Sequence, residues 1–216
     1  MGSNILIVDD HPVVQMGMRS FVDRYKLFEH TDVAGTGKEA VQFIKEHRAE
    51  PGFYEMAIVD INLPDYEAIA LVKFIMDNSP NTPIIMFSME PPKLYVKRLI
   101  NMGIKGFLNK TAPDEELLFA IKNVKAGKTY FSSEIMTDIV NNADDEISAV
   151  ANELSDRESE ILSLMIRGKS PKEICELLSL HKSSVATYRT RIFDKLGVNS
   201  NFELYQWALK EGLIHP

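Results

Sequence analysis

Short apolar runs alternate with stretches of helical periodicity over the first half of the chain. Four strong runs cover residues 5–8, 56–59, 83–87 and 106–108, and a weaker fifth covers 31–34. Runs of this length rich in Ile, Val and Leu are typical of strands buried on both faces of a parallel sheet. Helical apolar spacing follows each run, over residues 13–25, 37–46, 68–78, 92–102 and 117–126. Five consecutive strand–helix units predict a doubly wound α/β domain around a five-stranded parallel sheet.

The pattern changes after residue 129. Residues 130–152 include a polar Asn/Asp stretch without a regular period, and we interpret them as a linker. Residues 153–216 contain no strand-like run, and four helices are predicted there instead. Three of these helices begin at capping boxes, formed by Ser155 with Glu158, Ser170 with Glu173, and Ser200 with Glu203. We therefore expect an α/β domain at 1–129, a linker at 130–152 and an all-α domain at 153–216.

Composition restricts the class of protein without identifying it. The 216 residues are 45% apolar and 25% charged, which is ordinary for a globular protein. No apolar run approaches the roughly 18 residues of a membrane span, and no signal peptide is recognisable. The one cysteine, Cys175, lies at an apolar helical position and is expected in the core, so no internal disulfide is possible. We expect a cytoplasmic protein without membrane association.

The net charge of −7 is distributed unevenly along the chain. From residue 153 onward nine basic and nine acidic residues balance, and the remaining 15 basic and 22 acidic residues carry the whole excess. The all-α part is therefore neutral overall, and any basic surface on it has to be local.

Polar side chains follow the ends of the strong predicted strands. Asp9 and Asp10 follow the first strand, Asp60 follows the third, Ser88 the fourth and Lys110 the fifth. Any one of them alone would be read as a turn, a helix cap or a solvated residue. Because the carboxyl ends of parallel strands meet at one edge of a sheet, we expect all of them to converge there. Three converging carboxylates favour a divalent cation with oxygen ligands, and Mg²⁺ fits best.

These residues carry a family resemblance. The chain from Ile5 to about Lys128 resembles the receiver domain of bacterial two-component response regulators. The matching residues are Asp9-Asp10, Asp60 with Pro64 four residues on, Ser88, and Gly106-Phe107-Leu-Asn-Lys110.

The resemblance implies a role for each of these residues. Asp60 would accept a phosphoryl group from a histidine kinase, and Mg²⁺ would be held by Asp10, Asp60 and the backbone carbonyl of Asn62, with Asp9 acting through water. Lys110 and Ser88 would bind the phosphoryl oxygens, and Phe107 would enter the space that Ser88 vacates. The only chemistry expected of the chain is its own phosphorylation and dephosphorylation.

Two positions depart from the usual receiver pattern. Met89 stands where a small residue is usual, and Ala68 stands where glycine is frequent. We expect Met89 to narrow the access to Asp60. Asn62 and Glu90 flank the site in a combination that resembles fast-resetting receivers, which predicts a short-lived phosphoryl group.

The segment Leu154–Ile214 resembles the LuxR-type helix-turn-helix of the NarL/FixJ group. The matching residues are Leu154-Ser, Arg157-Glu158, Ile161-Leu162, Gly168, Lys172-Glu-Ile174, Leu177, Ser184-Val185, Ile192 and Lys195-Leu196. The resemblance implies binding to double-stranded DNA, and Gly168 and Gly197 fall where two of the helices should end.

The helix that follows the turn would contact DNA through its polar side. Val185, Ile192 and Leu196 recur at helical spacing and should face the core. The expected DNA contacts are Lys182, Ser183, Ser184, Ala186, Thr187, Arg189, Thr190, Arg191 and Lys195. His181 replaces a frequent capping serine, and Ser183 is the alternative cap.

The resemblance implies that the last helix pairs two DNA-bound copies of the protein. This role points to Leu204 and Trp207, although burial of Trp207 within its own domain is an equal alternative.

Three functions remain open at this point. The favoured one is a transcription regulator in which phosphorylation releases a masked DNA-binding helix and promotes a homodimer. A phosphatase or phosphotransferase would need an aspartate two residues after Asp60, where this chain has Asn62. A regulator that senses a ligand or partner without phosphorylation is the remaining alternative, and only Met89 favours it.

Overall fold

The computed structural model describes residues 3–47, 49–89, 96–133, 135–137, 154–178, 180–210 and 213–214. The chain forms two compact units, one made of Met1–Pro91 with Arg98–Met136 and one that includes Thr137–Pro216. No helix in the described ranges is long and apolar enough to cross a membrane.

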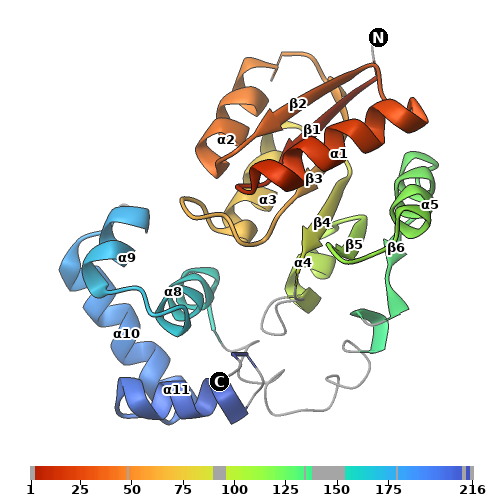
Figure 1. The fold of residues 1–216 in the computed structure, drawn as a ribbon. Coiled ribbons are helices and arrows are strands. Elements are labelled where there is room, and N and C mark those ends of the chain that lie inside the picture. Colours follow the sequence, from red (N-terminus) through yellow and green to blue (C-terminus); the bar gives the residue numbers. More distant parts are fainter. Residues whose placement is uncertain are drawn as a thin grey trace. The chain divides into compact units, whose positions relative to one another are not determined.

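Within its described residues, the first unit contains a six-stranded parallel sheet in the order β2-β1-β3-β4-β5-β6 (Figure 1). The strands are β1 (Asn4–Val8), β2 (His30–Ala34), β3 (Tyr54–Val59), β4 (Ile84–Ser88), β5 (Gly106–Asn109) and β6 (Tyr130–Phe131). All five predicted strands are present. β1 and β4 are buried at every position, as their continuous apolar runs predict.

Helices cover both faces of this sheet, which makes it doubly wound as predicted. They are α1 (Pro12–Tyr25), α2 (Gly37–Glu46), α3 (Ala68–Asn78), α4 (Val96–Met102) and α5 (Asp114–Lys125). Ile5 and Ile7 of β1 pack with residues of α1 and α5 in one core cluster, and alternation along the strand directs Leu6 and Val8 to the opposite face. Figure 1 shows α1 and α5 on one side of the sheet and α2 and α3 on the other.

The sixth strand lies in a segment that the sequence assigns to the linker. Tyr130 N–H donates to Lys105 O at 2.8 Å, and Ser132 N–H donates to Phe107 O at 3.3 Å. The described residues 130–133 and 135–136 thus lie with the first unit, although the expected linker begins at residue 130. A two-residue strand held by backbone bonds has too short a side-chain pattern to be recognised in a sequence.

The described part of the second unit consists of helices around one apolar core. These are α8 (Asp156–Ile166), α9 (Pro171–Leu178), α10 (Lys182–Leu196) and α11 (Asn201–Lys210). The core includes Ile161, Ile174, Val185 and Ile192.

Caps fix the ends of these helices largely where the sequence predicts. The boxes of Ser155 with Glu158 and of Ser170 with Glu173 are reciprocal. The third is half formed, because Glu203 accepts the N–H of Asn199 instead of that of its own cap. Gly168 and Gly197 follow the ends of α8 and α10 with φ of 76° and 65°, a backbone conformation that favours glycine.

Candidate acidic site and candidate nucleic-acid interface

Backbone hydrogen bonds continue past the strand ends and bring the predicted site residues together. Asp60 N–H donates to Val8 O and Lys110 N–H donates to Ser88 O, both at 2.8 Å. These bonds carry the alignment of β1 with β3 and of β4 with β5 into the loops that follow. The carboxyl edge of the sheet therefore places Asp9, Asp10, Asp60 and Lys110 in one site.

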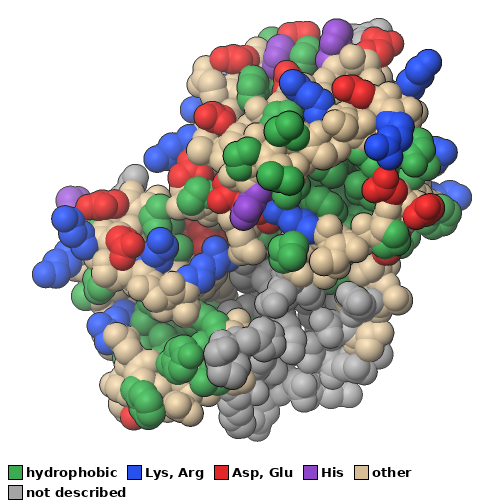
Figure 2. All heavy atoms as spheres, in the orientation of Figure 1, with side chains coloured by type: hydrophobic (Ala, Val, Ile, Leu, Met, Phe, Trp, Pro, Cys, Tyr) green, Lys and Arg blue, Asp and Glu red, His purple; other side chains and the backbone are tan. Residues whose placement is uncertain are grey.

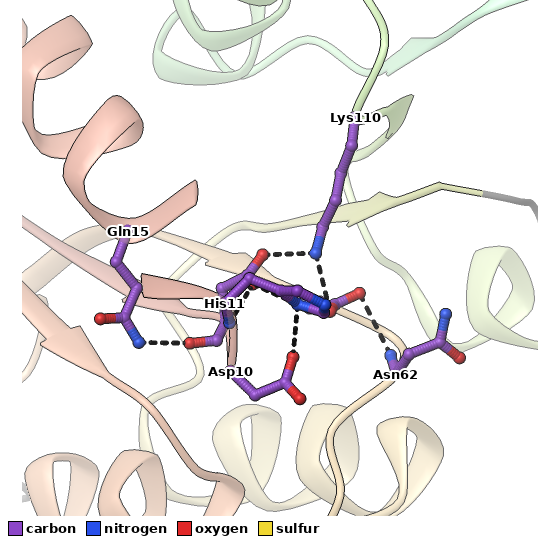
Figure 3. A network of polar contacts seen from close by, with 7 residues as sticks. Asp10, His11, Gln15, Asn62 and Lys110 are labelled. Atoms are coloured by element: carbon purple, nitrogen blue, oxygen red, sulfur yellow. Dashed lines mark hydrogen bonds and ion pairs between the residues drawn. The ribbon is translucent and has the colours of Figure 1, made fainter. Parts of the chain in front are cut away.

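Lys110 bridges two buried carboxylates (Figure 3). Its Nζ lies 2.6 Å from Asp9 Oδ2 and 2.8 Å from Asp60 Oδ2. The side chains of Lys110, Asp9 and Asp60 are only 5%, 3% and 1% exposed. Burial by itself would lower the pKa of Lys110, but the two carboxylates outweigh it and raise that pKa above its usual value. The ammonium is therefore charged and compensates the carboxylates in the absence of another cation.

His11 completes the acidic cluster. Its backbone N–H donates to Asp9 Oδ1 at 2.9 Å, and its Nδ1 lies 2.7 Å from Asp10 Oδ1 and 3.2 Å from Asp9 Oδ1. Ligand atoms of Asp9, Asp10, His11 and Asp60 lie within 4.8 Å of one another. Sequence reasoning missed His11, although its position directly after Asp9-Asp10 is the signal that could have identified it.

The cluster fits a divalent cation. Asp10 Oδ1 is buried without a hydrogen-bond donor among the residues that the structure describes, since the nearby His11 Nδ1 lacks hydrogen-bonding geometry. A buried carboxylate oxygen is costly unless it is paired, and a hard cation would pair it. The N–H of Asn62 donates to Asp60 Oδ1 at 3.1 Å, so the Ile61–Asn62 peptide lies beside the same carboxylate and the Asn62 carbonyl follows in the next peptide.

The two proposed switch residues are buried in neighbouring strands. Ser88 is fully buried at the end of β4 and Phe107 is 1% exposed in β5. Met89, which follows Ser88, is 57% exposed, and its carbonyl accepts a hydrogen bond from Asn109 Nδ2 at 2.9 Å. Glu90 lies outside the described residues.

The polar side of α10 is open to solvent. Val185 and Ile192 are buried as predicted, and Leu196 packs on the same core. Ser184 and Arg189 are half-buried, and the exposed side chains are Lys182, Ser183, Ala186, Thr187, Thr190 and Arg191. In the view of Figure 2, Lys and Arg side chains lie over the part of this unit that contains α9 and α10, with Asp and Glu side chains among them. The positive charge that this polar side of α10 presents to solvent comes from Lys182 and Arg191.

The N-terminus of α10 follows His181 and not Ser183. The helix begins at Lys182 with His181 as N-cap, whose side chain makes no capping hydrogen bond. Ser183 thus lies inside the first turn, and its alternative role as the cap is wrong. The hydroxyls of Thr187 and Thr190 donate to the carbonyls of Ser183 and Ala186, four residues earlier.

Lys195 has an internal partner. Its Nζ donates to Glu158 Oε2 at 2.7 Å, and the side chain of Glu158 is 4% exposed. Burial would raise the pKa of Glu158, but Lys195 and Ser155 together lower it below its usual value. Lys195 therefore ties the end of α10 to the start of α8, a role that sequence reasoning did not assign to it.

The two residues predicted to pair two copies, Leu204 and Trp207, pack in or against the core of their own unit. Leu204 is 4% exposed, and Trp207 is half-buried against the same cluster. Leu204 is therefore unavailable on the surface of a folded monomer. Phe202 and Tyr205 on α11 are 70% and 45% exposed, and they are the large apolar side chains that this helix presents to solvent.

Comparisons with known proteins cover both units. The family described as "Response regulator receiver domain" matches residues 5–122, and "Bacterial regulatory proteins, luxR family" matches residues 152–208. The oxygen regulatory protein NreC of Staphylococcus carnosus (strain TM300) is 34% identical over 219 residues, which cover 97% of this chain and 98% of NreC.

Solved structures of RcsB from Salmonella share the fold. RcsB from Salmonella enterica serovar Typhimurium, bound to promoter rprA in the presence of the phosphomimetic BeF3⁻, has a TM-score of 0.72 at 20% identity and covers 96% of this chain and 98% of its own. A second Salmonella typhimurium RcsB structure has a TM-score of 0.74 at 21% identity, with 97% and 98% covered.

Proposed function

The chain belongs to the response regulators that join a receiver domain to a LuxR-type DNA-binding domain, and from this we propose that phosphorylation of Asp60 controls its binding to DNA. This family consists of DNA-binding regulators of transcription and not of classical enzymes. The observation that carries the proposal is the buried Asp60 carboxylate at the carboxyl edge of the sheet, paired with Lys110 and next to Asp10 Oδ1, which accepts no hydrogen bond from the described residues.

The phosphoryl donor is a phosphohistidine of a sensor kinase. A carboxylate oxygen of Asp60 attacks the phosphorus, the P–N bond of the phosphohistidine breaks, and an acyl phosphate forms as the imidazole leaves with the bonding electron pair. Asp10, Asp60 and the Asn62 carbonyl would hold Mg²⁺, with Asp9 acting through water, and the ion would neutralise charge on the transferring group when bound.

Lys110 and Ser88 act on the product. In the free site Lys110 Nζ contacts Asp60 Oδ2, and we propose that it moves onto a phosphoryl oxygen once that carboxylate is esterified. The Ser88 hydroxyl donates to a second oxygen and leaves space that the ring of Phe107 enters. Because both side chains are buried, this exchange changes the packing of β4 and β5 and creates the two-state element that the phosphoryl group biases.

The second unit reads DNA through α10. Lys182 and Arg191 contact phosphates, while Ala186, Thr187 and Thr190 are short enough to reach base edges and thymine methyl groups. Two copies bind together, and we assign the contact between them to Phe202 and Tyr205 of α11, because Leu204 is buried. Paired weak sites give useful affinity from a modest local charge. The RcsB structure described as bound to promoter DNA supports this use of the fold.

We further propose that the unphosphorylated chain masks α10. An unphosphorylated protein that binds its operator as tightly as the same protein after phosphorylation would contradict the masking. The protein would then resemble the alternative regulator that works without phosphorylation.

The decisive experiment is the intact mass of the protein after incubation with Mg²⁺ and acetyl phosphate, with Asp60→Asn in parallel. We expect a phosphoryl adduct on the wild-type chain and none on the variant, together with tighter DNA binding and dimerisation of the adduct. If a cognate kinase and acetyl phosphate both fail to give the adduct, the proposed function is wrong.

A further inference from the structure

The loop that follows Asp60 is attached to a helix on another part of the chain. Asp65 Oδ1 accepts the N–H of Gly37 at 2.8 Å, and Asp65 Oδ2 accepts the N–H of Lys38 at 3.2 Å. Gly37 and Lys38 are the first two residues of α2, where backbone N–H groups have no partner inside the helix. Thr36 already accepts the N–H of Glu39, so Asp65 pairs the donors that the local cap leaves over.

The contact requires glycine at position 37. A Cβ atom added to Gly37 would lie 2.1 Å from Cβ and 2.7 Å from Cγ of Tyr66, far inside van der Waals distance. Gly37 does not have a positive φ, so its backbone conformation is open to other residues. Glycine is therefore required at position 37 because the loop approaches it closely, and not because of its backbone conformation.

Asn62 lies between two fixed points of this loop. At one end Asp60 follows β3, and its Oδ1 accepts the Asn62 N–H at 3.1 Å. At the other end Asp65 is held on α2 three residues after Asn62. The N–H of Asn62 lies in the peptide before its Cα and its carbonyl in the peptide after it, so the carbonyl belongs to the stretch between the Asp60 attachment and the Asp65 attachment. Its direction therefore depends on both.

We propose that Asp65 is a positioning residue for the cation site, and that it holds the loop on α2 so that the Asn62 carbonyl faces Asp10 and Asp60. Gly37 makes this possible by leaving room for Tyr66. The inference rests on the proposed function, because it assigns the Asn62 carbonyl to a divalent cation.

The first test measures Mn²⁺ affinity of the full-length chain by counting free Mn²⁺ with electron paramagnetic resonance. Mn²⁺ accepts the same oxygen ligands as Mg²⁺. Asp65→Ala should weaken binding about 10-fold, the scale on which lost outer-shell support acts. Asp65→Asn keeps the size and one acceptor, and it should fall between the alanine variant and the wild type.

A matched pair of double variants separates loop position from general damage. Gly37→Ala should weaken Mn²⁺ binding even though alanine is the better helix former. The double variant of Gly37→Ala with Tyr66→Ala keeps the obstructing Cβ of residue 66, so its defect in Mn²⁺ binding should persist. The double variant of Gly37→Ala with Tyr66→Gly removes that Cβ, so its Mn²⁺ affinity should recover. Tyr66→Ala and Tyr66→Gly alone control for loss of the ring, and thermal unfolding of each variant checks that it is folded.

The outcomes are distinguishable. Folded Asp65→Ala and Asp65→Asn variants that bind Mn²⁺ as tightly as the wild type overturn the inference, and so does equal binding by the two double variants. If Gly37→Ala does not fold, the Asp65 variants decide. A wild-type chain that binds no Mn²⁺ overturns the proposed cation site itself, and Asp60→Asn shows whether the binding measured belongs to that site.

Discussion

Replacing Lys110 by methionine keeps the length of the side chain and removes the ammonium between Asp9 and Asp60. In the wild type, Nζ lies 2.6 Å and 2.8 Å from oxygens of these two carboxylates. The variant leaves two buried negative charges facing each other, and we expect it to be less stable in the absence of divalent cations.

The size of the loss follows from the burial of the three groups. Removing one partner of a buried ion pair costs about 3–5 kcal/mol. We take the lower end, because the neighbouring His11 and Asp10 side chains are 63% and 28% exposed and place the site close to the surface. At a denaturant dependence of about 2 kcal/mol per molar urea, a loss of about 3 kcal/mol lowers the unfolding midpoint by about 1.5 M.

Urea unfolding of the full-length chain measures this loss. The single tryptophan, Trp207, belongs to the second unit, so its fluorescence follows that unit while far-UV circular dichroism follows both. We expect the Lys110→Met substitution to change the circular dichroism curve and to leave the fluorescence curve in place. This internal control distinguishes a local defect from a general one.

The second part of the prediction concerns the stabilisation of the Lys110→Met variant by Mg²⁺. A ligand at about 100 times its dissociation constant stabilises the state that binds it by about 2.7 kcal/mol. Lys110 occupies one oxygen of Asp9 and one of Asp60, so its removal should increase the affinity for Mg²⁺ and let the ion recover most of the lost stability. If the variant loses less than about 1 kcal/mol without Mg²⁺, or gains no more from the ion than the wild type does, the reasoning is refuted.

Three further predictions concern the second unit, one of them with a matched glycine in the first unit. The Glu158→Gln variant should lose about 1 kcal/mol of unfolding free energy at neutral pH, because the side chain gives up its charge toward Lys195. The folded-state pKa of Glu158 is below its ordinary value of 4.5, so this difference between variant and wild type should shrink as the pH falls below 4.5. Urea unfolding from pH 3 to 7 measures it. Gly197 has a φ of 65°, so Gly197→Ala should destabilise the protein by about 1 kcal/mol. Gly17 lies inside α1 with open space around it, so Gly17→Ala should stabilise the protein by about 0.5–1 kcal/mol. Equal shifts of the thermal unfolding temperature for the two variants would contradict this. Arg191→Ala should weaken binding to any duplex and reduce the salt dependence of affinity by about one unit in fluorescence anisotropy titrations, and an unchanged slope would show that Arg191 contacts no phosphate.

The sequence predicts those parts of the structure that depend on strong local patterns. Continuous apolar runs identify four of the five long strands, and a weaker run identifies β2. The convergence of Asp9, Asp60 and Lys110 follows because parallel strands end at one edge. Capping boxes locate the starts of α8 and α9 in the same way. Each of these inferences uses residues near one another in the chain or a topological rule.

The features that escaped prediction depend on contacts between distant segments or on the exact phase of a helix. Asp65 and Gly37 are 28 residues apart in the chain, and neither local sequence contains a pattern that predicts their contact. On α11, apolar side chains occur around much of the helix, so only packing shows that Leu204 faces inward and Phe202 outward. The backbone pairing that makes β6 has no side-chain signature.

The pairing of β6 with β5 has a consequence for hybrid regulators, in which a receiver is fused to a foreign output domain. A junction placed directly after α5 would remove the donors that Lys105 O and Phe107 O use, and would leave an edge of the sheet open beside Phe107. A junction beyond Ser132 keeps both bonds. A hybrid regulator should therefore keep the response of this receiver only when the foreign output domain begins after β6.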